Sequence, residues 1–355
     1  MKAGLVLTTI HDCRELLNAY YANFLDYCYL PDVTVYVVAD EKTPFGLYDV
    51  CNELAKKGLT ALFLTIEEQE SFLEELGIKP SFIQRNSDHR RNVGYLMAYL
   101  DGQDFIVSID DDNYPLPGVN FIGHHAIVCG RHVNWAVSTD SWFNPLEDLK
   151  TEPSILYPRG FPYFARGELN KLEHIDGIEL CRINEGLWVG DPDVDAISWL
   201  SETKPQSKGW LNGCETETVL GKKSWAPINS QNTAIHRDLI PAYYFVRSGH
   251  FGDIAQGYFV QAVAKAMGWS VRFGSPLVDH RRNSHNHLKD LQTDINDIVM
   301  LERLLPELTQ WKLKGSTVSD LYQDLASRID EFGLRGMAED MVIWNQVCKQ
   351  IGVSA

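Results

Sequence analysis

Three consecutive aspartates stand out as residues that could do chemistry. Asp110, Asp111 and Asp112 directly follow the apolar run DFIVSI (104–109), and two prolines soon after keep the loop from becoming a helix. Because side chains alternate along an extended chain, Asp110 and Asp112 point to one side and Asp111 to the other. Crowded carboxylates repel one another unless a cation neutralises them, and Mg²⁺ and Mn²⁺ favour oxygen ligands. The cluster therefore predicts a divalent-metal site, with a solvated acidic turn as the alternative.

A second candidate site lies nearer the C-terminus. The segment DHRRNSHNH (279–287) follows an apolar run and contains His280, a candidate metal ligand, together with Arg281 and Arg282. The planar guanidinium group suits phosphate oxygens. A basic surface loop is the alternative for this segment.

A third segment, YPRGFPYFARGE (157–168), combines two arginines with prolines and aromatic rings. The prolines restrict the backbone around Arg159 and Arg166, and the aromatic rings offer faces for a sugar. This composition is typical of a sugar or phosphate site, and a structural loop would also have it.

These residues need elements that position them, and the first third of the chain alternates strand and helix patterns. Apolar runs predict buried strands at 4–10, 33–39, 59–66 and 104–109, and helical periodicity is found at 16–24, 45–57 and 92–100. This alternation predicts an α/β fold with a mostly parallel sheet and helices on both faces. Ligands of such sheets bind beyond the carboxyl ends of the strands, where Thr8, Thr9, Asp40 and the three aspartates lie.

The rest of the chain predicts irregular structure followed by helices. Residues 140–235 are rich in Gly, Pro and Trp and predict ordered loops with short strands. A helix at 254–267 and a strand at 269–273 follow, and the pattern is helical from 288 onward. We therefore expect a main domain at 1–288 and a helical C-terminal extension at 289–355. The apolar side chains of the extension would pack on the core or form the interface of a homo-oligomer.

Composition and charge exclude several classes of protein. The chain has 355 residues, 45% of them hydrophobic, and a formal net charge of −16, so neither disorder nor nucleic-acid binding is expected. No apolar run approaches the ~18 residues of a transmembrane helix, and the N-terminus is interpreted as a strand rather than a signal peptide. The motifs GxxxxGKS/T, GxGxxG, HExxH and GxSxG are absent, which argues against NAD and flavin enzymes. Seven cysteines without CxxC spacing predict reduced thiols and a cytoplasmic protein.

Several segments, in order along the chain, resemble the reversibly glycosylated polypeptides of plants, also known as UDP-arabinopyranose mutases. This family has a glycosyltransferase-A-type fold, so the resemblance implies a nucleotide-sugar-binding catalytic domain at 1–288. The matching segments are VLTTIHD (6–12), RNVGYLMA (91–98), IDDDNYP (109–115), RGFPYFARGE (159–168), GLWVGDPDVDA (186–196), INSQNTAIHRDLIPAYYF (228–245), GDIAQGYFVQAVAKAMG (252–268) and SPLVDHRRNSHN (275–286).

The resemblance implies an enzyme that uses a nucleotide sugar, most often a UDP-sugar, and a divalent ion, Mn²⁺ or Mg²⁺, with neither flavin nor NAD. Asp110 and Asp112 match the acidic metal motif, and His280 matches a histidine that commonly completes the metal site in related folds. Asp111 belongs to the same motif and would contact the nucleotide. Arg91 matches an arginine ahead of a Gly-Tyr pair on the nucleotide side.

The resemblance also implies roles in sugar chemistry. Arg166 matches the arginine that becomes reversibly glycosylated, and Asp253 matches the second of two adjacent acids. Asp253 would contact sugar hydroxyls or act as a base. Thr8, Thr9 and Asp40, at the expected strand ends, would hold the nucleoside.

Two reactions and one different class of protein stay open. A mutase would return the sugar to the same nucleotide after ring contraction, whereas a transferase would pass it to an external acceptor. A non-catalytic sugar-nucleotide-binding scaffold is the third hypothesis. A scaffold has no use for three crowded carboxylates, which favours an enzyme.

Overall fold

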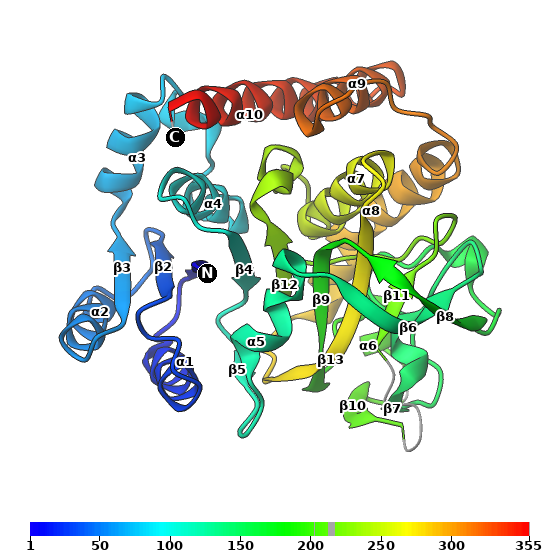
Figure 1. Ribbon diagram of the computed structural model, residues 1–355, viewed down its shortest axis with the longest axis horizontal. Coiled ribbons are helices and arrows are strands. Elements are labelled where there is room, and N and C mark those ends of the chain that lie inside the picture. Colours follow the sequence, from blue (N-terminus) through cyan, green and yellow to red (C-terminus); the bar gives the residue numbers. More distant parts are fainter. Residues whose placement is uncertain (202, 212–216, 355) are drawn as a thin grey trace.

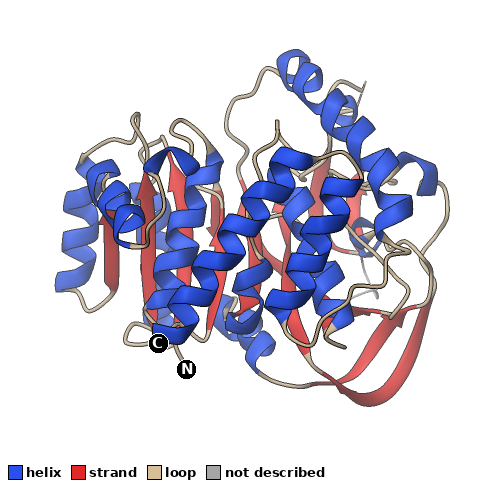
Figure 2. Ribbon diagram, turned by 90° about the horizontal axis from the view of Figure 1, so that it is seen from above, coloured by secondary structure: helices blue, strands red, loops and turns tan. Residues whose placement is uncertain are grey.

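The computed structural model describes residues 1–201, 203–211 and 217–354. Its centre is one long β-sheet with helices on both faces (Figure 1, Figure 2). The main path through the sheet has the strand order β3-β2-β1-β4-β12-β9-β13-β11-β6-β8. The α/β architecture predicted from the sequence is therefore confirmed.

The N-terminal half of the sheet is parallel, as expected. It is built from β1 (Ala3–Thr9), β2 (Val33–Ala39), β3 (Thr60–Leu64) and β4 (Phe105–Ile109). Nearly every residue of these strands is buried, because helices cover both faces. Their carboxyl ends meet at one edge, where Thr9 at the end of β1 lies between Asp40, which follows β2, and Asp110, which follows β4.

Helices α1 (Arg14–Asp26), α2 (Gly46–Lys56), α3 (Ile66–Glu75) and α4 (Arg91–Leu100) connect these strands. Helix α4 lies close against β1 and β2 because Gly94 has no side chain. A Cβ atom at Gly94 would lie 2.5 Å from Cγ1 of Val6 and 2.9 Å from Cγ2 of Val38. This close approach fixes the first turn of α4, which carries Arg91.

The second half of the sheet is mixed rather than mostly parallel. Strand β12 (Asn232–His236) runs antiparallel to both β4 and β9 (Cys181–Gly190), and β13 (Ser270–His280) runs parallel to β9. The short β5 (Asn113–Pro115) pairs antiparallel with the end of β13. The sheet changes character because β12 enters it in the reverse direction. The remaining strands are β6 (His132–Ser138), β7 (Leu149–Glu152), β8 (Leu172–Glu179), β10 (Gln206–Trp210) and β11 (Thr218–Leu220).

Three further helices belong to this half: α5 (Phe121–His125), α6 (Ala196–Trp199) and α7 (Gly252–Ala266). Short 3₁₀ helices lie at Pro80–Phe82, Asp88–Arg90, Ala126–Cys129, Pro145–Asp148, Tyr163–Ala165 and Arg237–Ala242. Helix α7 is buried along almost its entire length. Its first turn carries Asp253, which is buried with the rest of the helix.

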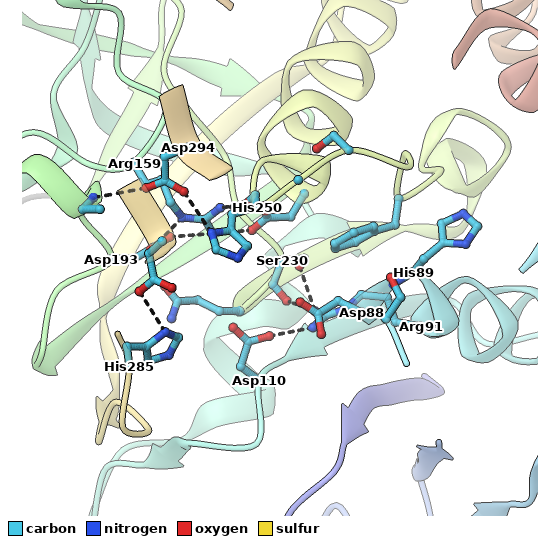
Figure 3. Close-up of a pocket in the computed structure, with 18 of the residues that line it drawn as sticks. Asp88, His89, Arg91, Asp110, Arg159, Asp193, Ser230, His250, His285 and Asp294 are labelled. Atoms are coloured by element: carbon cyan, nitrogen blue, oxygen red, sulfur yellow. Dashed lines mark hydrogen bonds and ion pairs between the residues drawn. The ribbon is translucent and has the colours of Figure 1, made fainter. Parts of the chain in front are cut away.

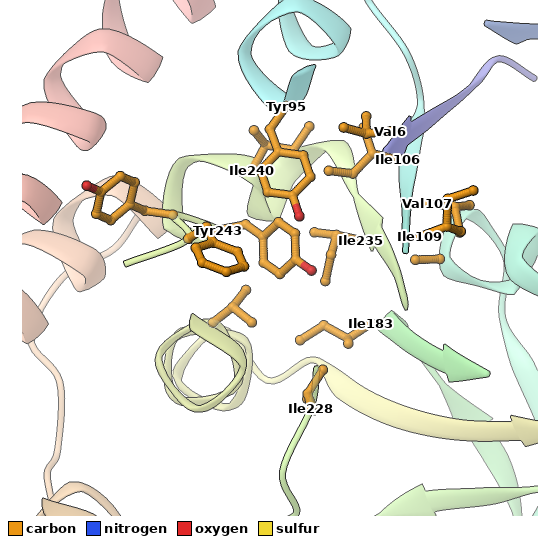
Figure 4. Packing of buried hydrophobic residues seen from close by; sticks show 14 of the residues in the cluster. Val6, Tyr95, Ile106, Val107, Ile109, Ile183, Ile228, Ile235, Ile240 and Tyr243 are labelled. Atoms are coloured by element: carbon orange, nitrogen blue, oxygen red, sulfur yellow. The ribbon is translucent and has the colours of Figure 1, made fainter. Parts of the chain in front are cut away.

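The two halves of the sheet share one apolar core (Figure 4). Fully buried side chains from both halves meet there, including Val6, Ile106, Val107, Ile109, Ile183, Ile235 and Ile240. The hydroxyl of Tyr95 shares a 2.7 Å hydrogen bond with Ser108 inside this core. Ser108 in turn accepts a hydrogen bond from Arg91 at 3.1 Å. Hydrogen bonds therefore connect the apolar core with the polar edge of the sheet, where Arg91 bonds to Asp110.

The C-terminal extension consists of α8 (His287–Leu308), α9 (Val318–Glu331) and α10 (Arg335–Ser354). Its apolar residues join the same core as the sheet; among them are Leu304, Leu305, Leu321, Leu325, Met341 and Trp344. The indole N–H of Trp344 donates to the carbonyl of Ile240 at 3.1 Å. The extension therefore packs on the core, while a homo-oligomer and a domain boundary at residue 288 stay predictions.

Among the described residues, no helix combines the length and the apolar character that crossing a membrane requires. Six cysteines are free thiols: Cys13, Cys28, Cys51, Cys129, Cys181 and Cys348. Cys214 lies outside the described residues. The expected cytoplasmic location stays a prediction.

Candidate active site

Asp110 lies directly after β4 and is held by Arg91 from α4. Nη2 of Arg91 donates to Oδ1 of Asp110 at 2.7 Å, and Nη1 donates to Oγ of Ser230 at 2.8 Å. The pKa of Asp110 is raised to about 6, because desolvation of the carboxylate outweighs the attraction of Arg91. Arg91 is thus a structural partner of the acidic cluster as well as a residue of the cavity wall.

Asp111 points to the other side of the loop, as the alternation of side chains predicts. Its Oδ2 accepts from the hydroxyl of Thr9 at 2.5 Å, and its Oδ1 accepts from the amide of Asn283 at 3.0 Å. Burial raises the pKa of Asp111. Asp111 therefore ties β1 to the loop that follows β13.

Asp112 faces His280 because β5 pairs with β13 and places Asn113 opposite His280. Nε2 of His280 lies 3.4 Å from Oδ1 of Asp112, and Nδ1 of His280 lies 2.5 Å from the carbonyl oxygen of Asp191. Burial opposes charge on both groups, but their mutual attraction outweighs it. The pKa of Asp112 is therefore lowered and that of His280 is raised.

The Asp112–His280 pair fits a divalent ion. Nδ1 of His280 carries a proton, because the carbonyl of Asp191 can only accept a hydrogen bond. Loss of the Nε2 proton to make room for a metal ion would therefore leave a lone pair that faces the carboxylate, as in histidines that ligate metals. Within the described part of the chain, no three His, Cys, Asp or Glu side chains already converge on one point. A hard ion there would take its remaining ligands from substrate phosphates and water, as Mg²⁺ and Mn²⁺ commonly do.

Two cavities meet at this cluster. The first cavity, of about 360 Å³, is lined by Thr8, Thr9, Asp40, Asp111 and the loop at 86–88. The second cavity, of about 200 Å³, extends toward α7 and α8. Both are lined by Arg91, Asp110 and Asp112. The structure thus brings every predicted metal- and nucleotide-binding residue together at one edge of the sheet.

Asp40 organises a loop of the first cavity. Its Oδ2 accepts from the backbone N–H of Ser87 at 3.0 Å, and its Oδ1 accepts from that of Glu41 at 2.8 Å. Asp40 is buried. The sequence predicted its position correctly, and the bonds indicate that it also shapes the wall of the cavity.

Arg159 occupies the second cavity between two carboxylates (Figure 3). Its guanidinium donates to Asp193 at 2.9 and 3.1 Å and to Asp253, in the first turn of α7, at 2.8 and 3.0 Å. Burial disfavours this charge, but the two carboxylates outweigh it and raise the pKa of Arg159 well above its ordinary value. Buried Glu185 lies near this group, and desolvation together with Asp193 raises its pKa. Both oxygens of Asp253 are therefore engaged by Arg159.

Arg166 is placed differently from Arg159. It is not among the described residues that line the two cavities. Its Nη2 donates to Oδ2 of Asp195 at 2.8 Å, and its guanidinium carbon lies 3.6 Å from the ring centre of Tyr163 and 5.0 Å from that of Tyr157. The structure therefore brings Arg159, rather than Arg166, together with the acidic cluster. The reactive role expected for Arg166 is not tested by this placement and stays a prediction.

The two arginines after β13 separate in the same way. Arg282 lines the second cavity. Arg281 pairs with Asp279 at 2.8 Å, lies 4.1 Å from the ring centre of Tyr114 and is exposed. Of the two phosphate-binding candidates, Arg282 is therefore the one that faces a cavity.

The structure adds residues that the sequence did not indicate. His250 and His285 line the second cavity, and each pairs with an aspartate of α8: Nδ1 of His250 lies 3.0 Å from Asp294, and Nδ1 of His285 lies 3.3 Å from Asp290. One signal was available, because Asp290, Asp294, Asp297 and Leu301 recur at helical spacing on one face of α8. Aspartates on the same face of a helix as a core leucine indicate that this face packs against polar groups of the protein rather than facing solvent.

Comparison with known proteins assigns this chain to the enzymes that act on nucleotide sugars. A family model described as "Reversibly glycosylated polypeptide" matches residues 65–351. The chain belongs to the reversibly glycosylated polypeptide family.

The chain is also similar to individual known proteins. UDP-arabinopyranose mutase 3 of Arabidopsis thaliana is 25% identical over 295 residues, which cover 78% of this chain and 75% of the relative. UDP-arabinopyranose mutase 1 of the same plant is 26% identical over 272 residues, covering 72% and 69%. Among solved structures, glucosyl-3-phosphoglycerate synthase of Mycobacterium tuberculosis with Mn²⁺ and UDP has a TM-score of 0.42 at 12% identity, covering 86% of this chain and 80% of that one.

Proposed function

We propose that this protein binds a UDP-sugar across the two cavities and rearranges the sugar between ring forms on the same nucleotide. The observation that carries this proposal is the Asp112–His280 pair at the junction of the cavities, 3.4 Å apart. This pair, with Asp110 beside it, would hold Mn²⁺ or Mg²⁺. A divalent ion there would stabilise negative charge on the departing diphosphate.

The nucleoside would occupy the first cavity. Thr8, Thr9, Asp40 and Asp111 line it and come from neighbouring strand ends. Open α/β sheets bind nucleotides at such strand ends. Arg91 would keep Asp110 in place through its 2.7 Å hydrogen bond to that carboxylate.

The diphosphate would extend toward the second cavity. Arg282 and Arg247 line that cavity. A guanidinium group can donate two parallel hydrogen bonds to a phosphate. The two arginines would therefore offset part of the acidic charge around a ligand that is itself anionic.

The sugar would occupy the second cavity. Its volume of about 200 Å³ is below the ~300–1,000 Å³ of pockets for drug-sized ligands, so it suits one monosaccharide better than a sugar with a large acceptor. This difference favours rearrangement on one nucleotide over transfer to an external acceptor. The relatives named UDP-arabinopyranose mutases support the same choice.

An arginine would hold the sugar covalently between the two nucleotide-bound forms, as the family resemblance implies. Arg159 is the better placed of the two candidates, because it lies in the cavity with Asp110 and Asp112. An arginine is protonated at neutral pH. As its nitrogen bonds to C1 and the C1–O bond electrons leave with UDP, the lost proton would pass to Asp193 or Asp253, which already accept its N–H groups.

The test is incubation with UDP-, GDP- and dTDP-sugars in the presence of Mn²⁺, with products separated by chromatography. The proposal predicts a new UDP-sugar isomer without any added acceptor. Turnover that requires an added acceptor would establish a transferase instead. Binding of UDP without turnover of any sugar nucleotide would favour a scaffold.

A further inference from the structure

His250 is the best-positioned titratable side chain of the second cavity. Its Nδ1 lies 3.0 Å from Oδ1 of Asp294, whose side chain is 4% exposed, whereas the imidazole itself keeps 46% of its exposure. Oδ2 of Asp294 accepts from the backbone N–H of Ala196 at 3.3 Å. Both oxygens of the Asp294 carboxylate are hydrogen-bonded, so this carboxylate has a fixed position and orients the imidazole ring of His250.

The backbone of His250 is held as firmly as its ring. Its N–H donates to Oδ2 of Asp297 at 2.9 Å, and its carbonyl accepts from Nη1 of Arg159. Asp297 also accepts from the N–H of Phe251 at 3.3 Å, at the start of α7. Helix α7 has no capping side chain of its own there, so an aspartate of α8 supplies the cap.

This arrangement leaves Nε2 of His250 available to a ligand. Within the residues that the structure describes, no protein group bonds to Nε2. A histidine whose Nδ1 is fixed by a buried carboxylate and whose Nε2 is open resembles the acid–base histidines of many enzymes. The groups around it are Asp290, Asp294 and Asp297 of α8 and Arg159. The hydrogen bond that Nδ1 of His250 donates to Asp294 raises the pKa of His250.

The two carboxylates beside Arg159 are directed at its guanidinium group rather than at the open part of the cavity. Asp253 accepts from Arg159 on both oxygens, and Asp193 accepts from Arg159 and from Asn229. Asp253 was the base expected from the sequence. His250 is better placed for this role, because its Nε2 is open to the cavity whereas both oxygens of Asp253 bond to Arg159.

We propose that His250, oriented by Asp294, is the acid and base that opens and recloses the sugar ring. This inference rests on the proposed function, in which an arginine nitrogen holds C1 of the sugar. The C1–O5 bond breaks, its electrons go to O5, and O5 takes the proton of Nε2 while the lone pair of the nitrogen forms a double bond to C1. Nε2 then removes the proton of the O4 hydroxyl as O4 bonds to C1, and the electrons of the double bond return to nitrogen.

The step is balanced within the molecule. One proton leaves the imidazole and one returns, and no oxidant or reductant is consumed. Cleavage of the bond between the sugar and UDP does not use His250 in this scheme. The two stages can therefore be measured separately.

The experiment compares wild type, His250→Gln, His250→Ala and Asp294→Asn with UDP-arabinopyranose and Mn²⁺. Formation of the sugar–protein adduct is read by intact mass, and the furanose isomer is read by chromatography. We expect both His250 variants to form the adduct at a rate within about twofold of wild type and to form the furanose isomer at least ~100-fold more slowly, a loss typical of a removed acid–base group. We expect added imidazole to restore isomer formation in His250→Ala. We expect Asp294→Asn to move the pH profile of isomer formation to lower pH.

His236→Gln is the matched control, because His236 pairs with Asp238 at 3.3 Å outside the two cavities. Isomer formation by His250→Gln at the rate of wild type would overturn the inference. Equal loss of adduct and isomer in His250→Gln, without imidazole rescue of His250→Ala, would also overturn it and leave a structural role. Absence of both adduct and isomer in wild type would instead contradict the proposed function.

Discussion

Nε2 of His280 and Oδ1 of Asp112 lie 3.4 Å apart, although 168 positions separate them in the chain. The pairing of β5 with β13 creates this proximity. A donor set of one imidazole and one carboxylate is suited to a divalent ion that also binds a diphosphate.

The first prediction concerns metal affinity. Replacing His280 by Gln should weaken binding of Mn²⁺ in the presence of UDP by at least ~10-fold, since loss of even an outer partner of a ligand costs this much. Isothermal titration calorimetry with and without UDP measures the effect. The control is Asp279→Asn, one residue away, whose partner Arg281 is exposed. Equal Mn²⁺ affinity of His280→Gln and wild type would exclude the pair as a metal site.

The second prediction separates the two arginines of the segment 157–168. With UDP-arabinopyranose, Arg166→Lys should still gain the mass of one sugar and Arg159→Lys should not. Peptide mapping of the adduct identifies the modified residue. Arg159→Ala should also lose ~3–5 kcal/mol of stability, because it leaves Asp193 and Asp253 buried without their partner. An adduct on Arg166 in the wild-type protein would restore the role expected from the sequence.

The third prediction concerns acid stability. Burial lowers the pKa values of His89 and His125 to about 3, from 6.5 for an ordinary histidine. Below about pH 6.5 these two histidines bind protons in the unfolded chain but stay neutral in the folded chain. The free energy of unfolding therefore decreases as the pH falls from about 6.5 toward 3. Urea unfolding at several pH values measures how the free energy of unfolding depends on pH. The slope for His125→Gln should be smaller than that of wild type by up to ~1.4 kcal/mol per pH unit. A slope in His125→Gln equal to that of wild type would contradict this explanation.

The fourth prediction concerns the C-terminal extension. Trp344 is fully buried and bonded to Ile240, whereas its neighbour Ile343 is 38% exposed. Trp344→Ala should lower the free energy of unfolding by ~3–5 kcal/mol, and Ile343→Ala by much less. Thermal and urea unfolding measure both. Similar small losses would indicate that α10 packs loosely on the core.

The N-terminal half of the fold could be predicted because its signals are local. Strand β2 was expected at 33–39 and is found there. Helix α4 and strand β4 differ from expectation by one residue at one end, and α2 differs by one residue at each end. Short continuous apolar runs that alternate with helical segments predict strands that are buried on both faces. The positions of Thr9, Asp40 and Asp110 then follow from the geometry of a parallel sheet.

The middle of the chain could not be predicted in the same way. Strand β9 runs through CRINEGLWVG, whose buried Asn184 and Glu185 interrupt any apolar pattern. Asn184 is accommodated by bonds to His125 and Arg272, which are distant in sequence. The His250–Asp294 pair was missed for the same reason, since only the packing of α8 on the start of α7 brings the two residues together.

The proposed function is tested most directly by following the conversion of one ring form of a UDP-sugar into the other. The protein is incubated with UDP-arabinopyranose and Mn²⁺, without an acceptor, and the nucleotide sugars are separated by chromatography. We expect UDP-arabinofuranose to appear, EDTA to abolish its formation and renewed Mn²⁺ to restore it. Undiminished conversion in EDTA, or no conversion of the UDP-sugar at any Mn²⁺ concentration, would contradict the proposed function.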